Sequence, residues 1–104
     1  MSPRIESWAG RVGVSPTGAR ICDLGRRWGM AKPDGEVVLH WALFQLRPTL
    51  VDYVLVHELV HLAERRHGAA FWHRLDRVLP DYGERRECLA EAGRRVWLGD
   101  IEQE

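Results

Sequence analysis

The chain has 104 residues, a length that suits one domain with a modest hydrophobic core. Its fifteen basic and fifteen acidic side chains give a formal net charge of zero, which offers no broad electrostatic attraction to nucleic acid or to anionic membranes. No apolar run reaches membrane-spanning length and the first residues lack a signal-peptide pattern, so we expect residues 1–104 to form a single cytoplasmic domain with no membrane partner.

Two cysteines, Cys22 and Cys88, stand far apart in the sequence and form no C-x-x-C pair. One disulfide between them is an option, but thiols are kept reduced in the cytosol. We therefore expect two buried thiols.

The first part of the chain is predicted to hold one helix and two strands. Residues 5–14 place apolar side chains at helical spacing. Residues 19–24 alternate weakly, and residues 36–41 are rich in β-branched, apolar and aromatic side chains, so both are predicted strands. The glycines and proline of residues 25–35 predict a connecting loop. We expect the two strands to pair antiparallel, with an edge that binds an extended peptide beside the following helix.

Two residues of this part are candidate substrate contacts. Trp28 lies in the predicted loop, where its main interpretation is a lid on the core and peptide contact is the alternative. His40 lies near the end of the second strand, where a structural or rim position is favoured over metal ligation.

Residues 48–62 are predicted to form a strongly apolar helix that contains the sequence His57-Glu58-Leu59-Val60-His61. Thr49 is the predicted N-cap, with Asp52 at the second position of a capping box. This HExxH spacing places both imidazoles one turn apart on one helix face, within reach of a single ion. Glu58 lies beside them, where it can hold a water molecule. Zinc suits such a set of neutral ligands with one position left open.

A third ligand is expected at His67. An ideal helix would rise about 15 Å over the ten residues from His57 to His67, so the chain must turn between residues 63 and 68. Glu64 is the competing ligand, three residues after His61 on the same face. One ion hardly accepts ligands from three successive turns of a straight helix, which ranks Glu64 below His67.

Two more helices are predicted in the last third of the chain. Residues 69–79 have helical apolar spacing and are stopped by Pro80, with His73 on the polar side. Asp81 is the predicted N-cap of the next helix, and Glu84 follows in the capping-box position. Gly99 suits the end of that helix, and residues 98–104 are expected to be a loose tail. The apolar stripe of the last helix consists of Leu89, Ala92, Val96 and Trp97.

Several short motifs occur in one order along residues 8–98. They are Arg27-Trp28-Gly29, Leu39-His40-Trp41, the segment from Asp52 to Leu62, His67-Gly68 with Phe71-Trp72, and Pro80-Asp81-Tyr82 with Arg85-Arg86. As an ordered set they resemble the YgjP-like metallopeptidases, relatives of the SprT and WLM zinc proteases. The resemblance implies an α+β fold with a compact, gluzincin-like zincin core, in which a small antiparallel sheet packs on the active-site helix and two helices follow.

The resemblance also implies a function and a set of site residues. It implies a peptidase with one Zn²⁺ ion on His57, His61 and His67 and with Glu58 as the general base. By family position or proximity, Tyr82, Arg85 and His73 are candidates for contacts to the substrate or the transition state. The family commonly continues Ser-Cys-Ser after the first motif, whereas this chain has Met30-Ala31-Lys32, so substrate recognition near this segment is expected to differ.

Peptides or proteins are therefore the expected substrates, hydrolysed by a zinc-activated water. Two other functions are consistent with the sequence. One is a zinc-stabilised binding or regulatory module without turnover. The other is a DNA-associated protease like the SprT relatives, against which the neutral net charge argues.

Overall fold

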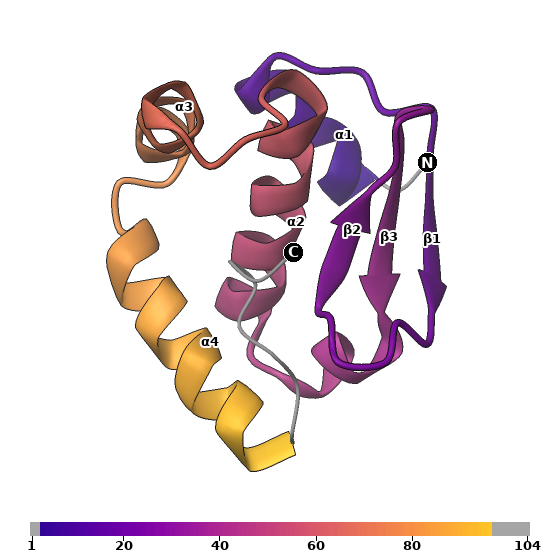
Figure 1. The fold of residues 1–104 in the computed structure, drawn as a ribbon, viewed down its shortest axis with the longest axis vertical. Coiled ribbons are helices and arrows are strands. Elements are labelled where there is room, and N and C mark those ends of the chain that lie inside the picture. Colours follow the sequence, from indigo (N-terminus) through magenta and orange to yellow (C-terminus); the bar gives the residue numbers. More distant parts are fainter. Residues whose placement is uncertain (1–2, 97–104) are drawn as a thin grey trace.

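The fold is arranged around one buried helix, α2 (Pro48–Ala63), which carries the HExxH sequence. Every residue from Tyr53 to Val60 is buried, and the helix contacts elements on all sides, including α1, β2, β3, α3 and α4 (Figure 1). A helix that is apolar around its whole circumference is expected to lie inside a domain. His57 and Glu58 are thereby carried into the interior of the molecule.

The structure, a computed structural model, describes residues 3–96, and side chains up to Arg94. It confirms the predicted mixed α+β class. The remaining elements, in chain order, are α1 (Pro3–Val12), β1 (Gly18–Cys22), β2 (Gly29–Ala31), β3 (Glu36–His40), the 3-10 helix η1 (Trp41–Gln45), α3 (Ala69–Val78) and α4 (Tyr82–Val96). Among these residues, no helix is both long and apolar enough to span a bilayer.

The sheet differs from the prediction. Its strand order is β1-β3-β2, with β2 antiparallel to β3 but β1 parallel to β3. The expected antiparallel pairing of the first and second predicted strands was therefore wrong. The segment predicted as a loop contains β2, so the chain reverses twice between β1 and β3, and these two strands run in the same direction (Figure 1).

The strand next to α2 at the edge of the sheet also differs from the one expected from the sequence. Strand β3 is central and its residues from Val37 to His40 are buried, so it is not the edge strand expected from the sequence. The short strand β2 forms the edge and contacts α2. A turn closed by a hydrogen bond from the Lys32 amide to the Glu36 carbonyl (2.8 Å) joins β2 to β3. Gly35 supplies the positive φ of 94° that this turn requires.

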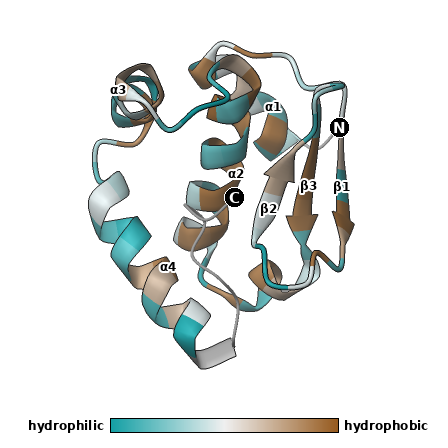
Figure 2. Ribbon diagram, viewed as in Figure 1, coloured by the Kyte–Doolittle hydropathy of each residue, from teal (hydrophilic) through white to brown (hydrophobic). Residues whose placement is uncertain are grey.

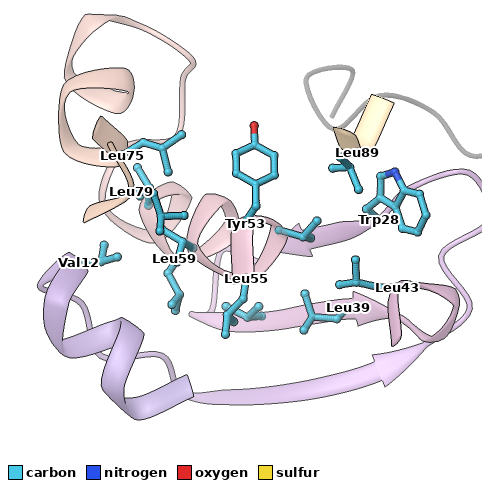
Figure 3. Close-up of a cluster of buried hydrophobic side chains, with 14 of the residues drawn as sticks. Val12, Trp28, Leu39, Leu43, Tyr53, Leu55, Leu59, Leu75, Leu79 and Leu89 are labelled. Carbon is cyan, nitrogen blue, oxygen red and sulfur yellow. The ribbon is translucent and has the colours of Figure 1, made fainter. Parts of the chain in front are cut away.

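Apolar side chains from all of these elements meet around α2. Figure 3 shows Val12 and Leu75 near one end of this core and Trp28 and Leu89 near the other. Trp28 is only 1% exposed, in agreement with its main interpretation as a cover on the core. Figure 2 shows hydrophobic residues along β3 and on several turns of α2, whereas α4 is mostly hydrophilic or neutral.

The N-terminus of α2 is not capped as predicted. The helix begins at Pro48, and Arg47 occupies the cap position with no side-chain hydrogen bond to the helix, so the assignment of Thr49 as N-cap was wrong. Proline is well suited to the first helical position because its missing N–H would lack an intrahelical partner there in any case.

Asp52 bonds to α1 instead of completing a capping box. Its carboxylate oxygens accept hydrogen bonds from Arg4 Nε (2.7 Å) and Arg4 Nη2 (2.8 Å). A third bond comes from Trp8 Nε1 at 3.1 Å. Proximity to Asp52 raises the pKa of Arg4 above its usual value through a hydrogen bond and a charge interaction. One carboxylate therefore fixes α1 against the first turns of α2.

Both predicted C-terminal helices are present. Helix α4 begins directly after Asp81, whose carbonyl accepts hydrogen bonds from the amides of Glu84 (3.1 Å) and Arg85 (3.3 Å). The predictions for Trp97, Gly99 and the tail of residues 98–104 lie outside the described residues.

The thiols differ in part from expectation. Cys22 and Cys88 are both free, but Cys22 is half-buried and Cys88 is exposed, so the prediction of two buried thiols was wrong. Cys88 precedes the buried Leu89 on α4 and consequently lies on the outer side of that helix.

The link between α1 and α2 gives a first testable prediction. Asp52→Ala should lower the free energy of unfolding by about 1–2 kcal/mol, because it leaves the half-buried Trp8 N–H without its acceptor. Arg4→Ala should cost less, since surface ion pairs contribute only about 0.2–1 kcal/mol. Urea denaturation of both variants measures the difference, with Asp76→Ala on exposed α3 surface as the control. Equal stability of Asp52→Ala and the control would contradict this role.

Candidate metal centre

Three histidines come together at the C-terminal end of α2. One ring nitrogen from each of His57, His61 and His67 lies within 4.8 Å of the others. The ring centroids are separated by 4.9 Å for His57 and His61, 5.2 Å for His57 and His67, and 4.6 Å for His61 and His67. The first two come from successive turns of α2, as their spacing predicts.

The third histidine arrives because the chain turns where the sequence requires it. Helix α2 ends at Ala63, and Glu64 adopts an extended conformation with φ −131° and ψ 101°. Helix α3 begins at Ala69, so His67 lies in the bend between the helices and returns toward α2. The side chain of Glu64 does not join the three histidines; its Oε1 lies 3.9 Å from Arg74 Nη2.

The backbone of the bend sets the orientation of His61. Its Nδ1 lies 3.2 Å from the carbonyl oxygen of Glu64, and a carbonyl only accepts, so Nδ1 carries the hydrogen. Nε2 is then the unprotonated nitrogen, and it lies 3.0 Å from Nε2 of His67. Two nitrogens bound to one tetrahedral zinc at 2.0–2.1 Å are about 3.3 Å apart. The observed spacing therefore fits a shared ion after a small adjustment.

The surroundings of His61 and His67 favour the neutral form of both imidazoles. Burial, together with the neighbouring charges of His57 and His67, lowers the pKa of His61 to about 4. Burial also lowers the pKa of His67, with additional contributions from His57 and Arg86. A metal ion binds the neutral form of imidazole, so the same packing that disfavours protonation prepares the ligands.

Aromatic side chains from the start of α3 hold the third histidine. The Phe71 ring lies 4.9, 4.6 and 4.8 Å from the rings of His57, His61 and His67, respectively. Trp72 stacks on His67 at 5.8 Å with an interplanar angle of 27°, and its Nε1 donates to the His67 carbonyl at 3.2 Å. In the sequence, both aromatic residues belong to a family motif and to a helix with apolar spacing, but neither was given a role beside the histidines, so this supporting role was missed.

Glu58 completes the site from inside the core. Its side chain is fully buried, and its Oε2 lies 3.4 Å from Nδ1 of His57. Gly29 of β2 lies directly against it: a Cβ atom at this position would be 3.0 Å from Glu58 Cγ and 3.1 Å from Val54 Cγ1. A glycine inside a strand often marks such a close approach. Because the sequence predicted a loop at residues 25–35, this role of Gly29 was missed.

A cleft opens beside these groups, between the end of α2 and the β2 segment. It has a volume of about 430 Å³, and Glu58 and His61 line it. Met30 of β2 and Lys32, which follows it, also line the cleft, as does Arg65 from the bend after α2. The candidate metal centre is therefore accessible from outside, although Glu58 itself is buried.

Two residues of α4 reach the aromatic layer behind His67. Tyr82 stacks on Trp72 at 5.6 Å with an interplanar angle of 25°. The guanidinium carbon of Arg86 lies 5.5 Å from the centroid of the Trp72 ring. Tyr82 was a predicted site residue, whereas Arg86 was missed in favour of its neighbour Arg85.

The other predicted contacts lie outside the group of three histidines. Arg85 donates to Asp81 Oδ2 and to the Thr49 carbonyl, both at 3.1 Å, and so joins α4 to the start of α2. His73 is exposed on α3, and Trp28 is in the core.

His40 is buried at the end of β3 and also lies apart from the three histidines. Its Nδ1 accepts a hydrogen bond from the Ala42 amide at 2.9 Å, which caps η1. Its Nε2 lies 3.5 Å from Asp23 Oδ1. The geometry thus gives His40 a structural position.

The close approach of β2 to Glu58 gives a second testable prediction. Gly29→Ala should lower the free energy of unfolding by roughly 1–3 kcal/mol, because the added methyl group overlaps two buried side chains. Gly10→Ala is the matched control: Gly10 is helical and a methyl group there would have no neighbour within 4 Å, so this change should be neutral or stabilising. Thermal or urea denaturation compares the two, and an unchanged stability of Gly29→Ala would refute the close contact.

Comparison with known proteins places the chain in a family. The family model of the YgjP-like metallopeptidase domain matches residues 1–92. Among solved structures, the chain is similar to the crystal structure of the metallopeptidase zymogen of Pyrococcus abyssi abylysin, with a TM-score of 0.77 and 23% identity over 86% of this chain and 90% of that chain. This likeness shows a shared fold and confirms the predicted zincin-like core. No curated protein sequence matches the chain. Because the family model covers most of the sequence, the chain belongs to the YgjP-like metallopeptidase family.

Proposed function

We propose that this chain is a zinc-dependent peptidase that hydrolyses peptide bonds with Glu58 as the general base. The observation that carries the proposal is the convergence of three imidazoles beside a buried carboxylate at an open cleft. Membership of a metallopeptidase family supports the same reaction class.

In this proposal His57, His61 and His67 hold one Zn²⁺ ion. Three neutral nitrogen ligands leave one coordination position for water or substrate, which is typical of catalytic rather than structural zinc sites. The hydrogen bond from His61 Nδ1 to the Glu64 carbonyl fixes the ring so that Nε2 faces the centre. When bound, zinc lowers the pKa of water and polarises a peptide carbonyl.

Glu58 moves the proton. Its carboxylate lies beside His57 and also lines the cleft, so it can contact both the attacking water and the substrate. It accepts a proton from the water and then donates it to the leaving amine nitrogen. Gly29 lies so close to this side chain that a Cβ atom there would be 3.3 Å from Oε2, and this close packing restricts the movement of the carboxylate.

The substrate is proposed to bind in an extended conformation along β2. This strand forms the edge of the sheet next to α2, and Met30 and Ala31 line the cleft. An edge strand offers main-chain donors and acceptors to a peptide without regard to its sequence. The sequence placed this edge at residues 36–41, but β3 is central, so β2 takes that role.

The role of Glu58 is tested by Glu58→Gln, which keeps the size of the side chain and removes its ability to accept a proton. We expect the variant to bind one zinc ion per chain while kcat falls by about 10²–10⁴-fold. Metal analysis and cleavage of casein or a peptide library measure the two properties. Undiminished hydrolysis would exclude Glu58 as the base, and a zinc-loaded wild-type protein that cleaves no peptide would instead favour the non-catalytic binding module.

The ligand role of His67 is tested separately. His67→Ala should weaken zinc binding by about 100-fold or more, because loss of a ligand exceeds the 10–100-fold effect of losing an outer partner. His73→Ala removes an exposed imidazole from α3 and is the control for zinc content. Competition with a chromophoric chelator gives both affinities. An unchanged affinity in His67→Ala would return Glu64 to consideration as the third ligand.

A further inference from the structure

The walls of the cleft carry an excess of positive charge. Of the described residues that line it, Arg27, Lys32 and Arg65 are cationic, and Glu58 is the single acidic residue. Glu58 lies against His57 at the buried end of the cleft, so its charge is directed toward the metal centre. This local excess contrasts with the formal net charge of zero for the whole chain.

Two of these cations keep their charge uncompensated. Lys32 is paired with Glu36 at 3.2 Å and with Asp34 at 3.8 Å. Within residues 3–96, by contrast, no carboxylate lies within 4.0 Å of the guanidinium group of Arg27 or Arg65. The hydrogen bond of Arg27 is to the sulfur of Met30, at 3.8 Å, which does not neutralise it.

We infer that the cleft selects peptides with an acidic side chain close to the cleaved bond, bound by Arg27 and Arg65. The inference rests on the proposed peptidase function and names its substrate class. Arg27 reaches the cleft from the segment before β2 and Arg65 from the bend after α2, so both can contact a peptide bound along β2. Like charges lining a cleft concentrate oppositely charged ligands there.

A peptide fits these observations better than a nucleic acid does. The cations are confined to one hollow of about 430 Å³ next to Glu58 and His61, rather than forming a stripe long enough to follow a phosphate backbone. The groups at the end of this hollow are also those that the proposed peptide hydrolysis uses. Binding of an oligonucleotide is therefore an alternative outcome of the test.

The first measurement uses the full chain loaded with zinc. A cleaved sequence is identified by mass spectrometry of a peptide library, and quenched fluorescent versions then carry Glu, Gln or Lys at single positions around the cleaved bond. The best Glu peptide should have a kcat/KM about tenfold above that of its Gln counterpart, as two partly exposed ion pairs provide. The preference should shrink at about 1 M salt, where charges are screened within about 3 Å.

Charge reversal with matched controls assigns the preference to residues. Arg27→Glu and Arg65→Glu should each reduce kcat/KM for the Glu peptide about fivefold or more and increase it for the Lys peptide. Arg26→Glu and Arg66→Glu change the net charge equally, but these neighbours do not line the cleft, so the Glu-to-Lys ratio should stay at the wild-type value. If a charge-reversal variant does not fold, Arg27→Gln and Arg65→Gln replace it in the same kinetic comparison. These neutral variants should abolish the preference for the Glu peptide without creating one for the Lys peptide.

A binding assay separates this inference from the proposed function. Fluorescence anisotropy of the same peptides with zinc-loaded Glu58→Gln measures affinity without turnover. Cleavage with equal kcat/KM for Glu, Gln and Lys peptides would overturn the acidic preference and leave the peptidase intact. Tight binding of Glu peptides with no cleavage by the wild type would support the preference and overturn the peptidase. In a competition experiment, an oligonucleotide and the unlabelled Glu peptide each displace the fluorescent Glu peptide. If the oligonucleotide does so at the lower concentration, the inference is overturned in favour of nucleic acid.

Discussion

The burial of His57 and Glu58 inside α2 is the constraint on which the rest of the structure depends. Polar groups are costly to bury, and an apolar helix carries this pair into the core only because α1, the sheet, α3 and α4 surround it. The exposed end of the same helix brings His61 to the cleft. A single helix therefore links the buried interior with the cleft that His61 and Glu58 line.

The supporting contacts follow from this arrangement. Asp52 fixes α1 to the start of α2, and Arg85 joins α4 to the same end. At the other end, Phe71 and Trp72 position His67 against the two helical histidines. The elements around α2 thus act on both ends of the helix, and the candidate metal centre lies where the bend, α3 and the sheet edge meet.

The sequence predicted the features that depend on strict local geometry. The HExxH spacing fixes the shared face of His57 and His61, and the helical rise requires a turn before His67; both features are present in the structure. The strand β2 was missed because its three residues, Gly-Met-Ala, have little strand propensity and are held by pairing with β3. The roles of Gly29 and Trp72 depend on contacts across the fold, which residue spacing does not encode.

The site has two halves, and the segments that form them are separated by different lengths of chain. All three histidines lie within eleven consecutive residues, from 57 to 67, so the half of the site proposed to bind metal is formed by a short stretch of chain and one turn. The half that positions Glu58 and encloses a substrate needs β2, almost thirty residues earlier. Loops that join distant segments cost more entropy to close. If the proposed function holds, partial unfolding of the sheet would stop turnover while the ion stayed bound, and metal retention alone would then be a poor measure of an intact active site.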